Sequence, residues 1–437
     1  MSKYLVDRLE NKKSIGYWSA VSIGIGGMVG GGIFAVLGLS VTLSHGGTPV
    51  AFAIAGLIAL VTAYSYSKLS VAFPSSGGTV EFLNQGIGTG ILTGGLNILL
   101  WISYVVMLSL YSHAFGSFGA TFFPSEDQTF WRHILTSIVI VSFTLLNFLN
   151  AKIVGKSEGM IVLFKILILL IFVIIGFWSI NFENLQPSTW ASPITLLAGG
   201  MIIFLAYEGF ELIATSAEDV ENPKKILPKA FYTSVLFVIG LYVIVSIVTV
   251  GNLSLDKIAE SRDFALAESA KPFLGQIGFT VIVIAALLST SSAINATFYG
   301  ASRISYIIAK TGELPRVLEK KIWNKPSEGL IITSILTLII SNLFDLSNIA
   351  IMGSSGFLLI FAAVNFANFR LHKKTSSIKW ISLIGSIGCF VALGVLIWQS
   401  ENTSPESIWI LVIMVGMSFL IEIIYRKISN RTHKRLS

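Results

Sequence analysis

The chain of 437 residues is 54% hydrophobic and only 12% charged, whereas about 25% of the residues in an average soluble domain are charged. This composition excludes a soluble fold of this length, and the thirty phenylalanines and nine tryptophans exclude a solvated, disordered chain. A single cysteine, Cys389, excludes an intramolecular disulfide framework and a cysteine-rich metal site. These properties indicate a membrane protein that crosses the bilayer many times. The formal net charge of +7 must therefore be read first as a signal of topology.

Stretches long and apolar enough to cross a bilayer recur along the whole chain, each of about 20 residues or more. We predict twelve spans, near residues 15–43, 48–68, 91–118, 133–151, 159–180, 193–215, 228–251, 275–309, 328–344, 346–370, 378–399 and 407–425. The eighth is long, and its end from Arg303 to Lys310 is expected to extend into water. The charged leader MSKYLVDRLENKK runs directly into a full-length first span, so no cleavable signal is expected.

The distribution of lysine and arginine supports the count of spans. With the N-terminus inside and the loops assigned alternately, 25 of the 30 basic residues lie in inside segments, and Lys165 lies within the fifth span. The outside loops hold only Arg132, Lys257, Arg262 and Lys271. This asymmetry follows the positive-inside rule and predicts an even number of spans with both termini cytoplasmic. The basic charge thus reflects topology, and no nucleic-acid partner is expected.

The first and sixth spans each contain residues that oppose a continuous helix. Residues 24–32 include six glycines, and glycine costs about 1 kcal/mol relative to alanine inside a helix. The sixth span carries Phe204-Leu-Ala-Tyr-Glu-Gly-Phe-Glu211, with two carboxylates at membrane depth. We therefore predict a break in both spans. Irregular backbone at this depth must be buried in protein or line a cavity. The pairs Gly26/Gly30 and Gly27/Gly31 would also suit helix packing, which is the alternative interpretation of the glycine run.

The two predicted breaks are five spans apart, and five is an odd number. Spans 6–10 would therefore enter the membrane from the side opposite to spans 1–5, as an inverted repeat with the binding site at the two breaks. We predict an all-α integral membrane fold of twelve transmembrane helices. Its parts would be a cytoplasmic tail (1–14), a first repeat (15–192), an inverted second repeat (193–372), and spans 11 and 12 with a cytoplasmic C-terminal tail (373–437).

Several motifs resemble those of the amino acid–polyamine–organocation (APC) permeases. They are Gly26-Gly-Met-Val-Gly-Gly-Gly-Ile-Phe34, Phe73-Pro-Ser-Ser-Gly-Gly78, the segment 204–211, Ala217-Glu-Asp-Val-Glu-Asn-Pro-Lys-Lys-Ile-Leu-Pro228, and the end of span 8 from Arg303 to Pro315. The resemblance covers roughly residues 15–370. It is strongest to prokaryotic proton-coupled, broad-specificity amino acid transporters. It implies the leucine-transporter-like fold, with five-plus-five inverted repeats and broken helices 1 and 6.

The resemblance also implies a binding site for an amino acid zwitterion. Helix N-terminal amides suit a carboxylate, and the family analogy assigns this role to Gly31 and Gly32, with Gly30 in the bend. Unpaired carbonyls at the ends of the broken half-helices suit the ammonium, a role carried over to Met28 and to the backbone near Leu205–Glu208. The family often has a serine where Gly31 stands.

Selection among substrate side chains would fall to Phe204, Tyr207 and their neighbours. Glu208 lies in the second break and would either attract the substrate ammonium or cap exposed amides; both interpretations stay open. Glu211 stands where the family usually has an acid, so we expect a role in proton movement or in stabilising the broken helix.

Lys165 is a basic residue within the fifth span. A charge at this depth costs at least about 2.5 kcal/mol, so an unpaired lysine facing lipid is not expected. In sodium-coupled relatives a cation lies between spans 1 and 8, and in the proton-coupled permeases a span-5 lysine takes that place. The expected neighbours are the carbonyls of Gly26 and Val29 and a hydroxyl of Ser289 or Ser292. A lysine that snorkels to the inner interface is the alternative.

The leading hypothesis is a secondary active amino acid transporter, working as a proton symporter by alternating access with Lys165 as the coupling group. Amino acid or polyamine exchange and sodium-coupled uptake are alternatives. A channel would show a continuous polar stripe, and a membrane enzyme would show clustered histidine, cysteine or aspartate at bilayer depth; the sequence has neither pattern. The expected partners are an amino acid, protons and the lipid bilayer, with no cofactor and no metal. A monomer in the plasma (inner) membrane is expected.

Overall fold

The computed structural model describes residues 15–149, 154–311, 327–403 and 405–429. Within these ranges every extended regular element is a helix, and β-type pairing is limited to the isolated bridges Ile15–Val220 and His45–Trp190. The predicted tail 1–14, and the end of the span-8 motif at 312–315, lie outside the described residues.

The long helices follow one another with short connections. They are α2 (Tyr17–Met28), α3 (Gly32–Ser44), α4 (Thr48–Ala72), α6 (Ile91–Ala120), α7 (Gln128–Leu149), α8 (Val154–Gly176), α9 (Pro193–Ile202), α11 (Pro223–Asn252), α14 (Lys271–Thr311), α15 (Ser327–Leu343), α16 (Leu346–Arg370), α18 (Lys379–Thr403) and α19 (Pro405–Ser429). Shorter elements between them include α5 (Thr79–Gly86), η5 (Ile203–Tyr207), α10 (Leu212–Thr215), α12 (Leu255–Glu260), η7 (Arg262–Phe264), α13 (Ala265–Glu268) and α17 (His372–Thr375).

Ten helical segments of the described chain are long and apolar enough to cross a membrane, and the bent pair α2 and α3 makes up to eleven. A shorter apolar helix, Gly329–Leu343, coincides with the ninth predicted span. The all-helical membrane class is therefore confirmed, whereas the count of twelve and the inverted repeat stay predictions. Several helices begin about five residues before the predicted spans, as at 128, 154 and 223, because helix ends carry polar residues that a hydropathy criterion leaves out.

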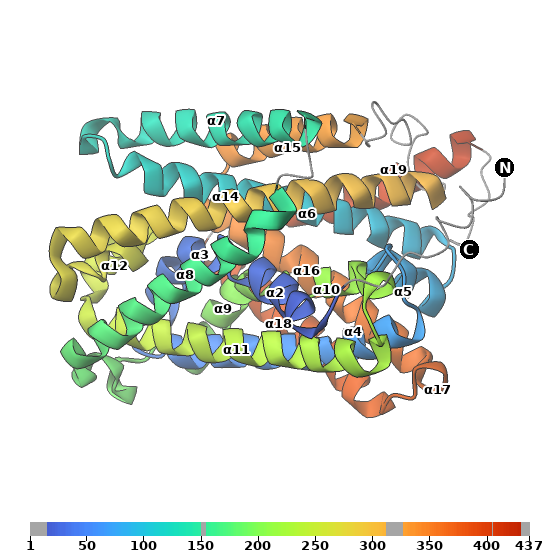
Figure 1. Ribbon diagram of the computed structural model, residues 1–437, viewed down its shortest axis with the longest axis horizontal. Coiled ribbons are helices and arrows are strands. Elements are labelled where there is room, and N and C mark those ends of the chain that lie inside the picture. The colour runs from blue at the N-terminus through green and yellow to red at the C-terminus, as the bar shows by residue number, and fades with distance from the viewer. Residues whose placement is uncertain (1–14, 150–153, 312–326, 404, 430–437) are drawn as a thin grey trace.

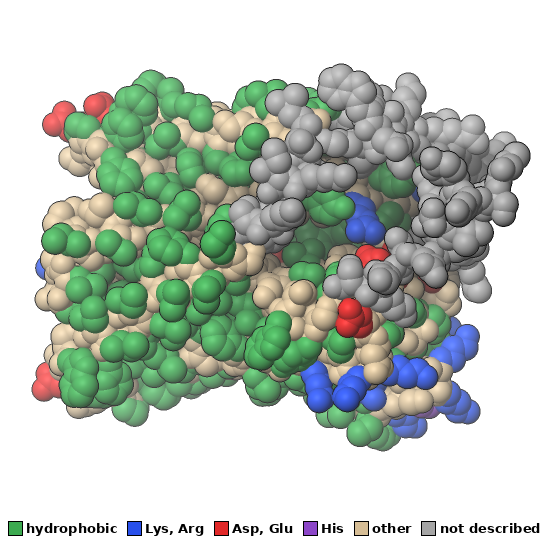
Figure 2. Space-filling model, in the orientation of Figure 1, with side chains coloured by type: hydrophobic (Ala, Val, Ile, Leu, Met, Phe, Trp, Pro, Cys, Tyr) green, Lys and Arg blue, Asp and Glu red, His purple; other side chains and the backbone are tan. Residues whose placement is uncertain are grey.

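The long helices run roughly along the long axis of the molecule, and short elements lie at its two ends (Figure 1). The segment with α12 lies at the left end, and α5 and α17 lie at the right end (Figure 1). Hydrophobic side chains cover much of the visible face between the ends, and lysine and arginine gather at the lower right (Figure 2). This arrangement is that of a protein whose middle faces lipid and whose ends face water.

The helices around the two predicted breaks form the buried centre of the protein. In the most apolar 18-residue stretches of α6 and α16, 83% of the residues are buried inside the protein. In the corresponding stretch of α19 only 28% are buried. The first half of the broken first span, α2, packs against α11, α8 and α10. Its second half, α3, packs against α9, η5 and η7. The element η5 in turn contacts α4 and α16. The central helices thus position the breaks, while α8, α18 and α19 present many exposed apolar side chains outward.

Candidate functional site

The first span is broken where the glycine run predicts. Helix α2 ends at Met28 and α3 begins at Gly32, and the two axes differ by 45°. Gly31 is the N-cap of α3, and the first N–H groups of a helix have no acceptor within that helix. The C-terminal carbonyls of α2 and the N-terminal amides of α3 therefore meet at one bend, with opposite polarity.

The second break lies in the sixth span. The 3-10 turn η5 ends at Tyr207, Glu208 is extended, and Gly209 has φ = +118°, a conformation that favours glycine. The Glu211 carboxylate accepts the N–H of Gly209 at 2.7 Å with Oε2 and the Tyr104 hydroxyl at 3.0 Å with Oε1. Since Glu211 is buried, these two bonds satisfy both carboxylate oxygens and hold the irregular turn.

The two breaks touch each other through backbone. A Cβ added to Gly27 would lie 2.7 Å from the Gly209 carbonyl oxygen and 2.9 Å from its Cα, and one added to Gly32 would lie 2.8 Å from the Ala206 Cα. Real Cβ atoms do not approach backbone this closely. The glycines at these positions therefore allow two interrupted spans, almost 180 residues apart in the sequence, to bring their bare peptide groups together.

The residues proposed for substrate binding are closed off in this conformation. Met28, Phe204, Leu205 and Tyr207 are fully buried and Glu208 is 4% exposed. Phe204 packs edge-on against Phe361, with ring centroids 5.8 Å apart. The Leu205 side chain lies against α16, where its N–H donates to the Ser354 hydroxyl at 3.3 Å.

Tyrosines surround the space between the breaks. The Tyr207 hydroxyl donates to the Phe52 carbonyl of α4 at 2.9 Å. The Tyr242 hydroxyl lies 2.6 Å from the Met28 carbonyl oxygen and 3.2 Å from that of Ala206. The Tyr111 ring fills the space beside Gly31, where an added Cβ would clash with it. A serine at position 31 would therefore require this ring to move.

Lys165 meets the first break from α8. Its side chain is 1% exposed, and Nζ donates to the Gly26 carbonyl at 3.1 Å. From α14, the Ser289 hydroxyl lies 3.1 Å from the Val29 carbonyl oxygen and 2.5 Å from that of Gly30. Ser292 lies one turn further along α14 and is half-buried. The ammonium of Lys165 thus contacts the interior of the protein and not the inner interface, and spans 1, 5 and 8 are joined by polar contacts.

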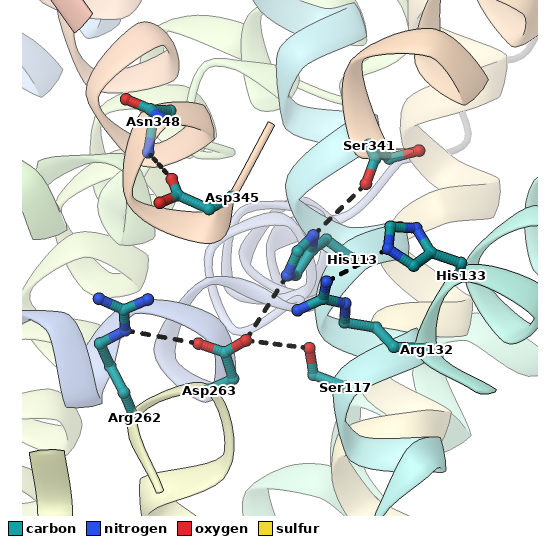
Figure 3. Close-up of polar contacts among 9 residues, drawn as sticks. All are labelled: His113, Ser117, Arg132, His133, Arg262, Asp263, Ser341, Asp345 and Asn348. Carbon is teal, nitrogen blue, oxygen red and sulfur yellow. Dashed lines mark hydrogen bonds and ion pairs between the residues drawn. The ribbon is translucent and has the colours of Figure 1, made fainter. Parts of the chain in front are cut away.

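A second polar cluster is formed around Asp263 by side chains of α6, α7 and η7 (Figure 3). The His113 ring, on α6 and only 2% exposed, has Nε2 3.5 Å from Asp263 Oδ2 and Nδ1 3.4 Å from the Ser341 carbonyl oxygen. Ser117 donates to the same Asp263 oxygen at 3.2 Å. His113 is therefore a packed residue that connects α6 to the segment η7.

Asp263 lies between the spans α11 and α14, outside the membrane-spanning segments. Burial by itself would raise the pKa of this carboxyl group, but the hydrogen bond and charge of His113, together with Arg262 and Arg132, outweigh burial and lower the pKa. A cavity of about 260 Å³ opens beside it, lined in part by Arg132, Glu260 and Phe264. The segment η7 is thus held to α6 by polar contacts as well as by packing.

Sequence reasoning missed Tyr104, Tyr111, Tyr242 and Ser354 at this site. A signal was present, because Tyr104 and Tyr111 are seven residues apart and so share one face of a helix. Hydroxyl groups in apolar spans also require hydrogen-bond partners. Their partners, however, are carbonyls and carboxylates on other spans, which the sequence does not identify.

Together, the apolar helices and the two broken segments, which meet at Gly27, Gly32 and Gly209, define a multi-pass membrane protein of the transporter class. The family model described as "Amino acid permease" matches residues 15–419. The chain therefore belongs to the amino acid permeases of the APC superfamily, and the family resemblance in the sequence is confirmed.

Three relatives illustrate the likeness. An uncharacterized protein, MJ0609, from Methanocaldococcus jannaschii is 38% identical over 428 residues, which cover 97% of this chain and 98% of the relative. The inner membrane transport protein YbaT from Escherichia coli is 32% identical, covering 91% of this chain and 93% of its own. The branched-chain amino acid permease BcaP from Bacillus subtilis is 26% identical, covering 83% and 82%.

Proposed function

We propose that the chain is a secondary active transporter that takes up amino acids together with protons by alternating access. The observation that carries the proposal is the backbone contact between the two broken spans, with Lys165 bound to a carbonyl of the first. Both termini would be cytoplasmic, and the protein would work as a monomer in the plasma membrane. The name of the relative YbaT, an inner membrane transport protein, supports this location.

The bend in the first span supports recognition of a zwitterion. The amides of Gly31 and Gly32, at the positive end of α3, would bind the substrate carboxylate. The carbonyls of Met28 and of Leu205–Tyr207 would bind the ammonium. Because all of these groups are backbone, recognition of the amino acid head does not depend on the substrate side chain. This arrangement suits a transporter of broad specificity.

Specificity would come from the side chains beside the second break. Phe204 and Tyr207 present aromatic surface to the substrate side chain, and Glu208 adds a carboxylate. If Glu208 is ionised in the loaded transporter, cationic amino acids are favoured; if it is protonated, neutral amino acids are. Uptake of all twenty radiolabelled amino acids into liposomes at pH 5 and pH 7.5 would decide between these preferences.

Lys165 would couple transport to protons. Its contact with Gly26, together with the Ser289 contacts to Val29, joins spans 1, 5 and 8. A protonated ammonium would hold these spans in the outward-open arrangement, and loss of the proton to the cytoplasm would release them. The ammonium would take the place that a cation holds between spans 1 and 8 in sodium-coupled relatives, which argues against sodium coupling.

The test is acid-driven uptake into proteoliposomes by wild type and Lys165→Ala, with and without sodium. We expect the variant to lose accumulation driven by an acid exterior, and sodium to have no effect on wild type. Lys373→Ala, which removes an exposed lysine on α17, is the matched control and should transport normally. Undiminished acid-driven accumulation by Lys165→Ala would reject the coupling role.

A further inference from the structure

Tyr242 lies on α11, outside both broken spans, yet its hydroxyl contacts both of them. The oxygen is 2.6 Å from the Met28 carbonyl oxygen and 3.2 Å from the Ala206 carbonyl oxygen. The side chain is fully buried. Its ring packs against Phe52, with centroids 5.8 Å apart, and against Tyr207, with centroids 5.3 Å apart. These contacts place the hydroxyl at the junction of the two breaks.

The carbonyls of Met28 and Ala206 need a hydrogen-bond donor wherever the site is closed. Each lies at the end of a helical segment, where the chain no longer supplies the amide that a continuous helix would. A carbonyl buried without a donor is costly. In the loaded transporter the proposed function supplies this donor as the substrate ammonium. After the substrate has left, another donor must take its place if the site is to close again.

We propose that the Tyr242 hydroxyl is the internal substitute for the substrate ammonium, an inference that rests on the proposed amino acid site. In the empty transporter its single O–H would be shared between the carbonyls of Met28 and Ala206, the two acceptors that it contacts in the structure. In the loaded transporter the ammonium takes these carbonyls and the hydroxyl gives way. Tyr242 thereby allows the empty transporter to close and return.

This role separates two kinds of transport. Net uptake requires the transporter to return empty after each substrate is released, whereas exchange returns it loaded with another substrate. Removing the Tyr242 hydroxyl leaves two carbonyls without a donor only in the empty, closed state. Tyr242→Phe should therefore slow net uptake and spare exchange. The variant should also bind substrate more tightly, because the competing donor is gone.

The chain offers a matched control in Tyr66, on α4. Its side chain is equally buried, but its hydroxyl is hydrogen-bonded to that of Thr79 at 2.9 Å, which belongs to neither break. Tyr66→Phe removes a hydroxyl of the same chemistry from the buried interior without touching the proposed substrate site. If loss of any buried hydroxyl disturbed the empty state, the two variants would behave alike.

The experiment compares wild type, Tyr242→Phe and Tyr66→Phe in proteoliposomes, with the radiolabelled amino acid that wild type takes up fastest among the twenty. Net uptake is measured into liposomes without internal substrate under an acid exterior, and exchange into liposomes preloaded with the unlabelled amino acid. We expect Tyr242→Phe to lose about tenfold in net uptake, the effect of one hydrogen bond, and to exchange within about twofold of wild type. Tyr66→Phe should keep the wild-type ratio of the two rates.

An unchanged ratio in Tyr242→Phe, or an equal loss of net uptake and exchange, would overturn the inference, because the hydroxyl would then matter equally to the empty and loaded states. Wild type that shows neither activity would instead defeat the proposed function.

A second measurement keeps the inference testable if the variant does not fold. 3-Fluorotyrosine introduced at position 242 should show a fluorine resonance that shifts when saturating substrate is added. The same probe at position 66 should shift less, and equal shifts at the two positions would contradict the inference.

Discussion

The closest backbone contact between the two broken spans depends on single hydrogen atoms. Gly27 faces the carbonyl and Cα of Gly209, and Gly209 itself adopts a positive φ. A methyl group at either position would meet backbone, which cannot rotate away as a side chain can. The glycine run of the first span thus has both effects that the sequence leaves open. It bends the helix, and it lets another segment approach closely.

Gly27→Ala should therefore reduce both stability and transport. Its Cβ would lie 2.7 Å from a backbone oxygen, and overpacking of this kind costs about 1–3 kcal/mol. Gly240→Ala on α11 is the matched control, because nothing lies within 4 Å of its added Cβ. The control should be up to about 1 kcal/mol more stable than wild type, because alanine is favoured over glycine in a helix interior. Melting temperature in detergent and uptake in liposomes check both variants; a Gly27→Ala variant as stable as the control would contradict the contact.

Glu211 is a second residue whose effect can be measured directly. Its two oxygens accept one N–H and one O–H, whereas a glutamine would turn an N–H₂ group toward one of these donors. Glu211→Gln should therefore cost about 1–3 kcal/mol, the penalty of an unsatisfied buried group. Tyr104→Phe removes only one donor and should cost less. Chemical denaturation of both single variants and of the double variant measures their coupling, and additive effects would show that the bond is not formed.

At the scale of elements, the short segment η7 lies between α6 and the outer half of the first span. It approaches α3 so closely that a Cβ on Gly38 would clash with the Arg262 carbonyl. Asp263 of the same segment contacts His113 and Ser117 of α6. A segment held on both sides in this way restricts movement of α3, which the proposed alternating access requires. The charge of Asp263 is therefore a point where pH acts on the stability of the fold.

The lowered pKa of Asp263 predicts the sign of this effect. The folded protein holds the carboxylate form more strongly than the unfolded chain, whose aspartates titrate near about pH 3.9. The resulting stability is fully present above that pH and is lost as pH falls through the lower, folded pKa. Asp263→Asn should therefore be less stable than wild type at pH 7, and the difference should shrink on acidification below about pH 4.

Thermal unfolding of the purified protein from pH 7 to pH 3 measures this difference. Glu183→Gln removes an exposed carboxylate from the loop after α8 and serves as the control, with the wild-type pH profile. A constant difference between wild type and Asp263→Asn over the whole range would show that the stability does not depend on the charge of Asp263.

At the scale of the whole molecule, the arrangement of charge supports a defined orientation in the membrane. Lysine and arginine gather at the end that holds α17, and α12 lies at the opposite end (Figure 1, Figure 2). From the positive-inside rule we expect the basic end to face the cytoplasm. The only cysteine of the chain, Cys389, is fully buried, so introduced thiols can be labelled against a low background.

We expect a cysteine at Glu183, after the fifth span, to react with a membrane-impermeant maleimide on intact cells. A cysteine at Lys373, in α17, should react only after the membrane is permeabilised. Both positions are exposed, so accessibility differs only through the membrane. Reaction of both thiols from the same side would show that the predicted number of spans between them, or their orientation, is wrong.

Much of the fold could be predicted from the sequence because its signals are local. Hydropathy over about 20 residues identifies spanning helices, and six glycines between positions 24 and 32 oppose a straight helix whatever surrounds them. Lys165 was identifiable as a residue that needs a partner, since a charge at that depth is costly. Its place beside Gly26 came from the family resemblance, not from the residues themselves.

What the sequence by itself determined is the membrane class, the approximate positions of the long apolar helices and the two places where helices break. Only the tertiary structure decided which groups satisfy those breaks. Tyr242 donates to a carbonyl 214 residues away, Glu211 accepts from a tyrosine 107 residues away, and His113 meets Asp263, 150 residues further along the chain. The physical reason is that propensity and hydropathy act over a few neighbouring residues, whereas a buried polar group takes its partner from whichever distant helix packs beside it.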